Sequence, residues 1–209
     1  MSVKNLLQAA TLVAATSFFT GCVSLGGLMG GSSGGDFGAT EGEVVGLINT
    51  SLQNLTKSQA IMLDALDLKD EAAVAENTAK SLEDGSLTGK DELAEQIENA
   101  KSTNEKIKAE MSKNVALSED AKRKFGTALL PYGKGVVAGI SGAKKAADAL
   151  KSLSSDPMNI TKFGTLVYVG KEAPGLLSMF ADATSSIKDF ATYQGINTDD
   201  LSAADESGL

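Results

Sequence analysis

The stretch DALDLKD, residues 64–70, places three carboxylates where they could bind a metal ion or share a proton. Asp64, Asp67 and Asp70 are three residues apart, which is a helical stride and not the alternating spacing of a calcium-binding loop. The stretch also lacks the central glycine of such a loop. We therefore interpret these carboxylates as solvated charges on one helical face and predict no metal site.

Other groups that catalyse reactions are scarce. The chain of 209 residues has no histidine and one cysteine, so the commonest general base, a common metal ligand and any internal disulfide are missing. The glycine-rich stretches carry no Walker lysine, and no Ser-x-x-Lys pair occurs with its supporting motifs. Because no residue merits a catalytic or cofactor-binding role, we predict a protein that is not an enzyme and has no cofactor.

The single cysteine, Cys22, lies in FFTGCVSLGG, residues 18–27. It follows Lys4 and an uncharged, largely apolar run over 6–19, which is too short for a stable membrane span. A tuned thiol needs a folded pocket, and the glycine- and serine-rich residues after Cys22 do not favour one. We therefore favour covalent attachment at Cys22 over the alternative of an ordinary buried thiol.

Phe19, Thr20, Gly21 and Cys22 resemble the lipobox of bacterial lipoprotein precursors, although the position of Phe19 is usually leucine. The resemblance covers about the first tenth of the chain. It implies a signal peptide over 1–21 and an acylated Cys22 that holds the protein on a membrane. Val23 stands where the family typically has the aspartate that retains such proteins at the inner membrane. The resemblance therefore implies an anchor in a Gram-negative outer membrane, on its periplasmic or surface side.

The composition divides the rest of the chain into three parts. Residues 22–39 are expected to form a flexible tether, because 25–38 are rich in glycine and serine; such a tether spans about 20 Å on average. Residues 194–209 hold acids, serine and glycine without apolar periodicity, which predicts a disordered acidic tail. The residues between them, 40–193, are enough for one domain with one core.

Apolar residues recur at steps of three and four over 45–66, 93–111, 136–150 and 176–190. An amphipathic helix is stabilised mainly by burying its apolar stripe. We therefore predict an all-α fold, an antiparallel multi-helix bundle with heptad-like seams. The predicted breaks are 83–89, 112–120, Pro131, 154–159 and 170–175, and Ser118 and Asp156 are predicted helix starts.

Gln59 and Asn104 interrupt two of these seams with amide side chains. A polar core residue can fix the register of packed helices, and this is the interpretation that we favour. The alternative is a polar ligand site inside the bundle. The sequence leaves both interpretations open.

The stretch FGTALLPYGKGVVAGISGA, residues 125–143, has Lys134 as its only charge. Its length approaches that of a membrane span, but a central lysine costs about 2.5–3.5 kcal/mol on insertion, and Pro131 also disfavours a spanning helix. Gly135, Gly139 and Gly142 share one helical face. These glycines either let a neighbouring helix approach closely or form a candidate interaction surface that enters lipid or docks into a partner.

Charge is unevenly distributed along the chain. The formal charge of −8 argues against a general nucleic-acid binder. Residues 62–100 contain eleven acids, whereas 101–151 contain eleven bases, so we expect acidic and basic helices to lie against each other. The alternative is that basic residues form a surface for anionic lipid or acidic polysaccharide. The candidate residues for that surface are Lys122, Arg123, Lys124, Lys144 and Lys145.

Together these features predict a non-catalytic, lipid-anchored envelope protein that serves as an interaction, assembly or scaffold module through its helical bundle. The expected partners are the membrane, through the N-terminal lipid, and a protein of the cell envelope; nucleic acid is not expected. The alternative is a membrane-active or lipid-handling helical protein that uses residues 125–143.

Overall fold

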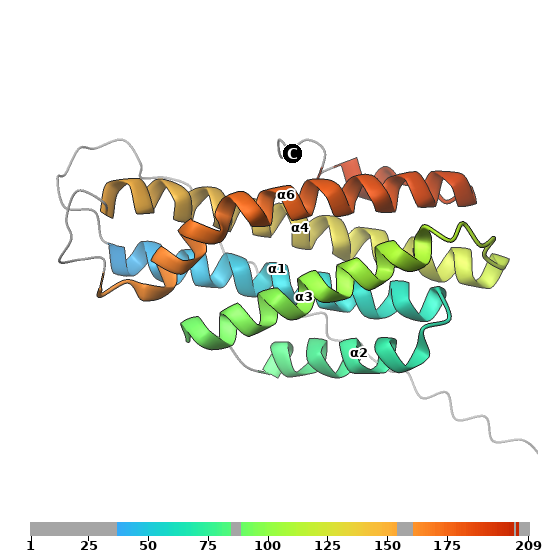
Figure 1. Ribbon diagram of the computed structural model, residues 1–209, viewed down its shortest axis with the longest axis horizontal. Helices are drawn as coiled ribbons and strands as arrows, with labels where there is room; N and C mark the ends of the chain where they lie inside the picture. The colour runs from blue at the N-terminus through green and yellow to red at the C-terminus, as the bar shows by residue number, and fades with distance from the viewer. Residues whose placement is uncertain (1–36, 85–88, 154–160, 203, 205–209) are drawn as a thin grey trace, which may run out of the picture. The chain divides into compact units, whose positions relative to one another are not determined.

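The structure is a computed structural model that describes residues 37–84, 89–153, 161–202 and 204. Within these ranges the chain forms five α-helices and no strand, which confirms the predicted all-α class. The helices are α1 (Phe37–Ala65), α2 (Lys69–Asp84), α3 (Lys90–Met111), α4 (Glu119–Leu153) and α6 (Gly164–Gln194), followed by the short 3₁₀ helix η1 (Asp199–Leu201) (Figure 1). The predicted signal peptide, Cys22 and nearly all of the predicted tether lie outside the described residues.

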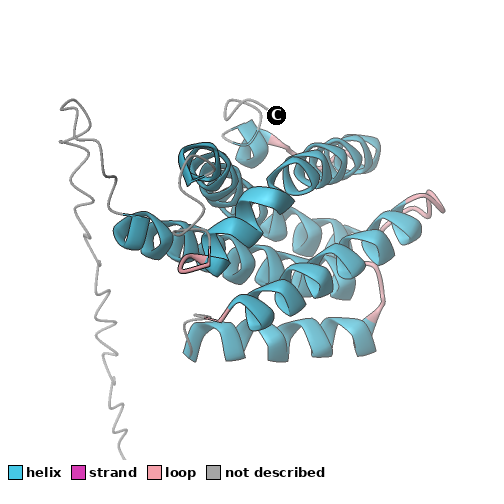
Figure 2. Cartoon of the chain, turned by 60° about the vertical axis from the view of Figure 1, so that its left-hand side comes forward, coloured by secondary structure: helices cyan, strands magenta, loops and turns pink. Residues whose placement is uncertain are grey.

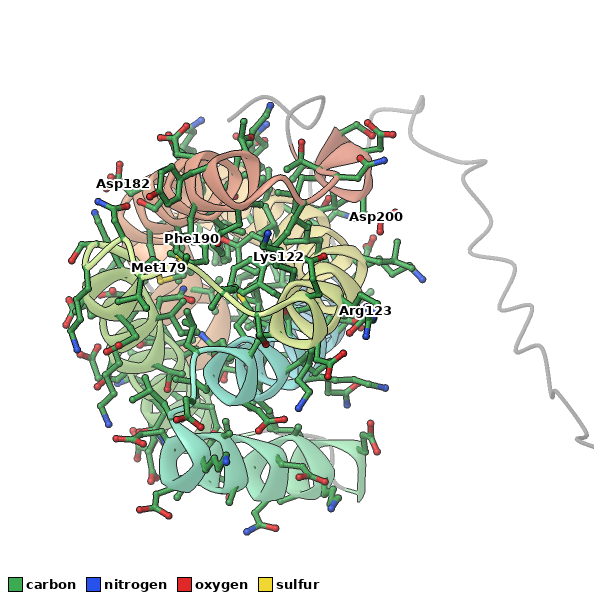
Figure 3. The ribbon with its side chains drawn as sticks, turned by 90° about the vertical axis from the view of Figure 1, so that its right-hand side faces the viewer. Lys122, Arg123, Met179, Asp182, Phe190 and Asp200 are labelled. Carbon is green, nitrogen blue, oxygen red and sulfur yellow. The ribbon has the colours of Figure 1, made fainter. Side chains whose placement is uncertain are left out.

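Consecutive helices run in opposite directions along the bundle (Figure 1). Seen nearly along their axes, α1, α3, α4 and α6 surround a common core, and α2 lies outside this group against α1 (Figure 3). Figure 2 shows the same arrangement from an intermediate direction. Helix α1 packs against every other α-helix described, and its interface with α4 is the most extensive.

Helix α1 is buried on several faces because other helices surround it. Leu55, Met62 and Leu63 are at most 1% exposed. The helix also buries polar side chains, and the Ser58 hydroxyl donates a hydrogen bond to the carbonyl of Ala128 in α4 (2.8 Å). The buried face of α1 begins one residue before the predicted range 45–66. Val44 is fully buried, whereas Val45 is half-buried.

Two predicted breaks are wrong, because α4 continues through Pro131 and α6 continues through Pro174. A proline inside a helix removes a backbone hydrogen bond and costs about 3 kcal/mol. Leu129 and Tyr132, on either side of Pro131, are both fully buried. Burying each such side chain contributes about 1.5–3 kcal/mol, so tertiary packing offsets the local penalty in α4.

The connection between α3 and α4 agrees with the sequence. Residues 112–118 are not helical, and α4 begins at Glu119. The Ser118 hydroxyl accepts a hydrogen bond from the N–H of Ala121 (3.2 Å), which is the predicted N-terminal cap. Residues 85–88 of the predicted break 83–89 lie outside the described residues, as do the whole predicted break 154–159 and the predicted helix start Asp156.

The end of the chain differs from the expected disordered tail. Gly195 ends α6 in the left-handed conformation (φ 74°), which glycine adopts without strain. The chain then turns back through η1, and both Leu201 in η1 and Ala204 after it are fully buried. A Cβ atom at Gly133 of α4 would lie 2.8 Å from the carbonyl oxygen of Asp200, so this glycine lets the returning chain approach. Residues 203 and 205–209 lie outside the described residues.

Candidate binding groove between helices α3 and α6

The three predicted interaction glycines lie inside the bundle, in the interface between α4 and α1. A Cβ atom at Gly135 would lie 3.0 Å from the Ser51 carbonyl oxygen, and one at Gly142 would lie 2.9 Å from Ile48 Cδ1. At Gly139 it would lie 2.6 Å from both the Ser51 hydroxyl oxygen and a ring carbon of Phe180 in α6. The glycines therefore permit close helix packing, and in this conformation they offer no surface to a partner.

Residues 125–143 lie within α4 and bury one face of it in the core. Phe125, Leu129, Tyr132 and Val136 are fully buried, whereas Leu130 is 46% exposed. In the described part of the chain, no helix is long and apolar enough to cross a membrane. The low charge of this stretch thus corresponds to burial within the bundle.

The basic residues at the start of α4 lie beside acids. Lys122 pairs with Glu119 (3.0 Å) and Arg123 pairs with Asp120, one turn earlier in each case. Lys124 forms an ion pair with Asp64 of α1. Figure 3 shows Lys122 and Arg123 near one end of the bundle.

A second ion pair joins the opposite ends of the same two helices, from Lys145 of α4 to Glu43 of α1. Of these two pairs only Lys124–Asp64 joins the acidic range 62–100 to the basic range 101–151, and the acidic helix α2 packs mainly on α1. The contacts of α4 therefore do not bear out the predicted packing of acidic helices against basic ones. Because surface pairs of this kind contribute about 0–1 kcal/mol each, they affect orientation more than stability.

Gln59 and Asn104 meet in the core, 45 residues apart in sequence. The Gln59 amide nitrogen donates to the Asn104 side-chain oxygen (2.9 Å) and to the backbone carbonyl of Ala100 (2.9 Å). Gln59 is 1% exposed and Asn104 is 8% exposed. The pair fixes α1 against α3, as a register-setting contact would. It leaves the Asn104 amide nitrogen buried and without a hydrogen-bond partner among the described residues.

Asn104 also lines a groove of about 340 Å³ between α3 and α6. The two helices run in the same direction (Figure 1). Lys101 of α3 forms an ion pair with Glu172 of α6 (3.5 Å). The apolar lining consists of Ile107, Met111, Met179, Ala183 and Ile187. Figure 3 shows Met179 near the boundary between the two helices and Asp182 on the outer side of α6.

Two further grooves are less suited to a specific ligand. One of about 690 Å³ lies between α1, α2 and α4, where the Lys124–Asp64 and Lys80–Glu76 ion pairs already engage four of its charged groups. The other, of about 400 Å³, lies between α2 and α3 and has Gln59 among its lining residues. Gln59 and Asn104 thus connect the α2–α3 groove with the α3–α6 groove through one hydrogen bond.

Two tyrosines have perturbed acidity. Burial raises the pKa of Tyr132, and its long hydrogen-bond contact with Thr184 (3.4 Å) offsets only part of that effect. Burial also raises the pKa of Tyr168, and the carboxylates of Glu172 and Glu98 add to the shift. Within the described ranges, no three His, Cys, Asp or Glu side chains converge as metal ligands would.

Sequence reasoning identified Asn104 but missed the groove around it. The available signal was an amide side chain, Asn104, in an otherwise apolar row of residues. It indicated either a contact that sets the helix register or a ligand site. Met111 lies on the predicted α3 seam, whereas Met179 lies outside the predicted α6 seam, so no sequence pattern joins them. Comparisons with family models, curated proteins and solved structures found no match for this chain.

Proposed function

We propose that the protein is a non-catalytic, lipid-anchored interaction module of the bacterial outer membrane. The observation that carries the proposal is the lipobox-like sequence ending at Cys22, 15 residues before the first helix of the described residues begins at Phe37. A flexible glycine- and serine-rich segment of that length spans about 20 Å, which keeps a bundle near a membrane while it reorients.

The charge of the bundle supports a protein partner with a basic surface. Helices α2 and α3 together carry eleven acids and six bases, whereas α4 carries seven bases and three acids. Asp70, Glu76, Glu95 and Glu98 are among the exposed acids on α2 and α3. Complementary charge steers encounters and fixes orientation, so the α2–α3 side is the surface that we assign to docking.

The burial of residues 125–143 opposes the alternative of a membrane-inserting segment. Phe125, Leu129 and Tyr132 are in the core, and releasing them into lipid requires α4 to separate from α1 and α6. No contact of the described residues favours that opening, so the interaction module is the proposal that we retain.

The anchor is tested by fractionating cells that express the wild-type chain, Cys22→Ser or the neighbouring control Ser24→Ala. Wild type and the control should sediment with outer membranes and incorporate a clickable palmitate analogue, whereas Cys22→Ser should be unlabelled and soluble. Val23→Asp should move the labelled protein to the inner membrane. Equal membrane retention and labelling of Cys22→Ser would show that the anchor is not at this residue.

The docking surface is tested separately by photocrosslinking in intact cells. A photoreactive residue replaces the exposed Val74 on α2 (68% exposed) or, as the matched control, Leu130 on α4 (46% exposed). We expect a discrete protein adduct from position 74 that disappears when Glu76 and Glu95 are changed to lysine. A protein adduct from position 130 alone would assign docking to the opposite side.

A further inference from the structure

The Asn104 side chain holds a hydrogen-bond donor that nothing in the described chain satisfies. Its oxygen accepts from Gln59, but its amide nitrogen has no partner, although the residue is only 8% exposed. Leaving a buried donor unpaired costs about 1–3 kcal/mol. Asn104 lines the α3–α6 groove, but its nitrogen is enclosed in this conformation, so the amide must turn toward the groove before an acceptor bound there can recover that free energy.

The rest of the groove is aliphatic. Its apolar lining includes Ile107 and Met111 of α3 and Met179 and Ile187 of α6, and none of the described residues that line it is aromatic. From Asn104 to Met111 the helix rises about 10 Å. Flexible methionines adapt to a narrow chain, whereas sugars and planar bases are usually bound by stacking on aromatic rings.

The charged groups of the groove balance one another. Lys101 and Lys108 are opposed by Glu105 and Asp182, and Lys101 is already paired with Glu98 and Glu172. A ligand with a net charge would therefore gain no net attraction, because one pair repels it while the other attracts it. This arrangement favours a neutral or zwitterionic head group with a carbonyl acceptor.

We propose that the α3–α6 groove binds a single acyl chain of a neutral or zwitterionic amphipath. Its ester or amide carbonyl accepts the hydrogen bond from the Asn104 amide nitrogen, and its chain lies along Ile107, Met111 and Met179. The volume of about 340 Å³ is near the lower limit for small-ligand sites and is too small to enclose a helical peptide, whose diameter is about 10–12 Å.

This inference does not depend on acylation of Cys22 or on the docking surface of α2 and α3. Failure of the fractionation experiment would leave the groove unaffected. Conversely, an empty groove would leave the anchored interaction module as proposed.

The test is a titration of the full chain carrying Cys22→Ser, labelled with ¹³C at its methionine methyl groups, with 1-decanoylglycerol below its micelle concentration. The Met111 and Met179 signals, assigned with Met→Leu variants, should shift with saturation, and that of Met62, which is fully buried in α1, should not. Decanoate and decyltrimethylammonium should bind more weakly because each carries a net charge.

Two variants test the hydrogen-bond donor of Asn104 and the space in the groove separately. Asn104→Asp keeps an acceptor for Gln59 but removes the donor, and it should weaken binding about tenfold, as expected for one lost hydrogen bond. Ala183→Phe fills the groove but keeps the Asn104 amide, and it should abolish the shifts. Thermal unfolding confirms that each variant folds, and should Asn104→Asp fail to fold, Asn104→Leu replaces it.

The proposal is overturned if 1-decanoylglycerol gives no saturable shift, which would mean that water alone satisfies Asn104. If Asn104→Asp and Ala183→Phe are both folded and bind 1-decanoylglycerol as tightly as the wild type does, the ligand binds outside this groove. Preferential binding of a charged amphipath, or of an amphipathic helical peptide in place of the acylglycerol, would refute the assigned ligand class.

Discussion

Gly139 illustrates how single residues determine the packing of this bundle. Its missing side chain leaves room for Ser51 of α1 and Phe180 of α6, which belong to two different helices. Gly46, in contrast, has no atom within 4 Å of the position that a Cβ would occupy. Residues of one type therefore have opposite roles, and only their surroundings distinguish them.

We expect Gly139→Ala to destabilise the protein. The new methyl group would crowd Ser51 and Phe180, and overpacking typically costs about 1–3 kcal/mol, more than the gain of about 1 kcal/mol in helix propensity. Gly46→Ala, the matched control, should raise the free energy of unfolding by up to about 1 kcal/mol. Urea denaturation measures both, and a Gly139→Ala variant as stable as the Gly46→Ala variant would contradict the close-packing interpretation.

Tyr132 should make the stability of the bundle depend on alkaline pH. Burial raises its pKa in the folded state above the usual value of about 10, so the folded protein keeps the proton longer than the unfolded chain does. The contribution of the protonated Tyr132 phenol to the free energy of unfolding is complete below pH 10. As the pH rises above 10, that free energy falls by about 1.4 kcal/mol per pH unit. The free energy of unfolding of Tyr132→Phe should therefore fall less steeply above pH 10.

The control for this experiment is Tyr193→Phe, which removes a hydroxyl from a ring that is 63% exposed. Urea denaturation between pH 9 and pH 11 compares the three proteins. If Tyr132→Phe and the wild type lose stability in parallel, the phenol does not cause the alkaline instability.

At the scale of elements, the segment after α6 packs on the bundle, although its acidic composition without apolar periodicity predicts a disordered tail. The side chain of Gln194 bridges to the α3–α4 connection, donating to the carbonyl of Val115 (2.9 Å) and accepting from the N–H of Leu117 (3.0 Å). This contact and the turn at Gly195 return the chain toward α4, where Leu201 is buried.

We expect Leu201→Ala to lower the free energy of unfolding by about 2 kcal/mol or more, because it leaves a cavity beside α4. Ser202→Ala, an exposed neighbour, should change it by less than about 0.5 kcal/mol. Urea denaturation of both variants provides the comparison. Equal stabilities would show that residues after 195 do not dock in solution.

At the scale of the whole molecule, stability is unevenly distributed. Helix α2 packs mainly on α1, through the small side chains of Ala72, Ala75 and Ala79 together with Leu82. Helices α1 and α4 share the most extensive interface and bury the larger side chains Leu55, Phe125 and Tyr132. The α2 helix therefore depends on the four-helix core more than the core depends on it.

Hydrogen exchange followed by mass spectrometry should reflect this difference. Amides of α2 should exchange through local opening, well before those of α1 and α4, which should exchange only on global unfolding. Ala75→Gly in α2 should accelerate exchange of α2 alone. Uniform protection of all the helices would instead indicate a single cooperative unit.

The sequence by itself determined the helical class, the stripes of most helices and the cap at Ser118, because these depend on residues three or four apart. Only the tertiary structure decided that the glycine stripe is internal, that Pro131 and Pro174 lie within helices, and that Leu201 is buried. The same holds for the α3–α6 groove, which joins Asn104 to Met179 across 75 residues. Local spacing specifies which face of a helix is apolar, but the choice of the neighbour that covers it depends on the burial energy of the whole bundle.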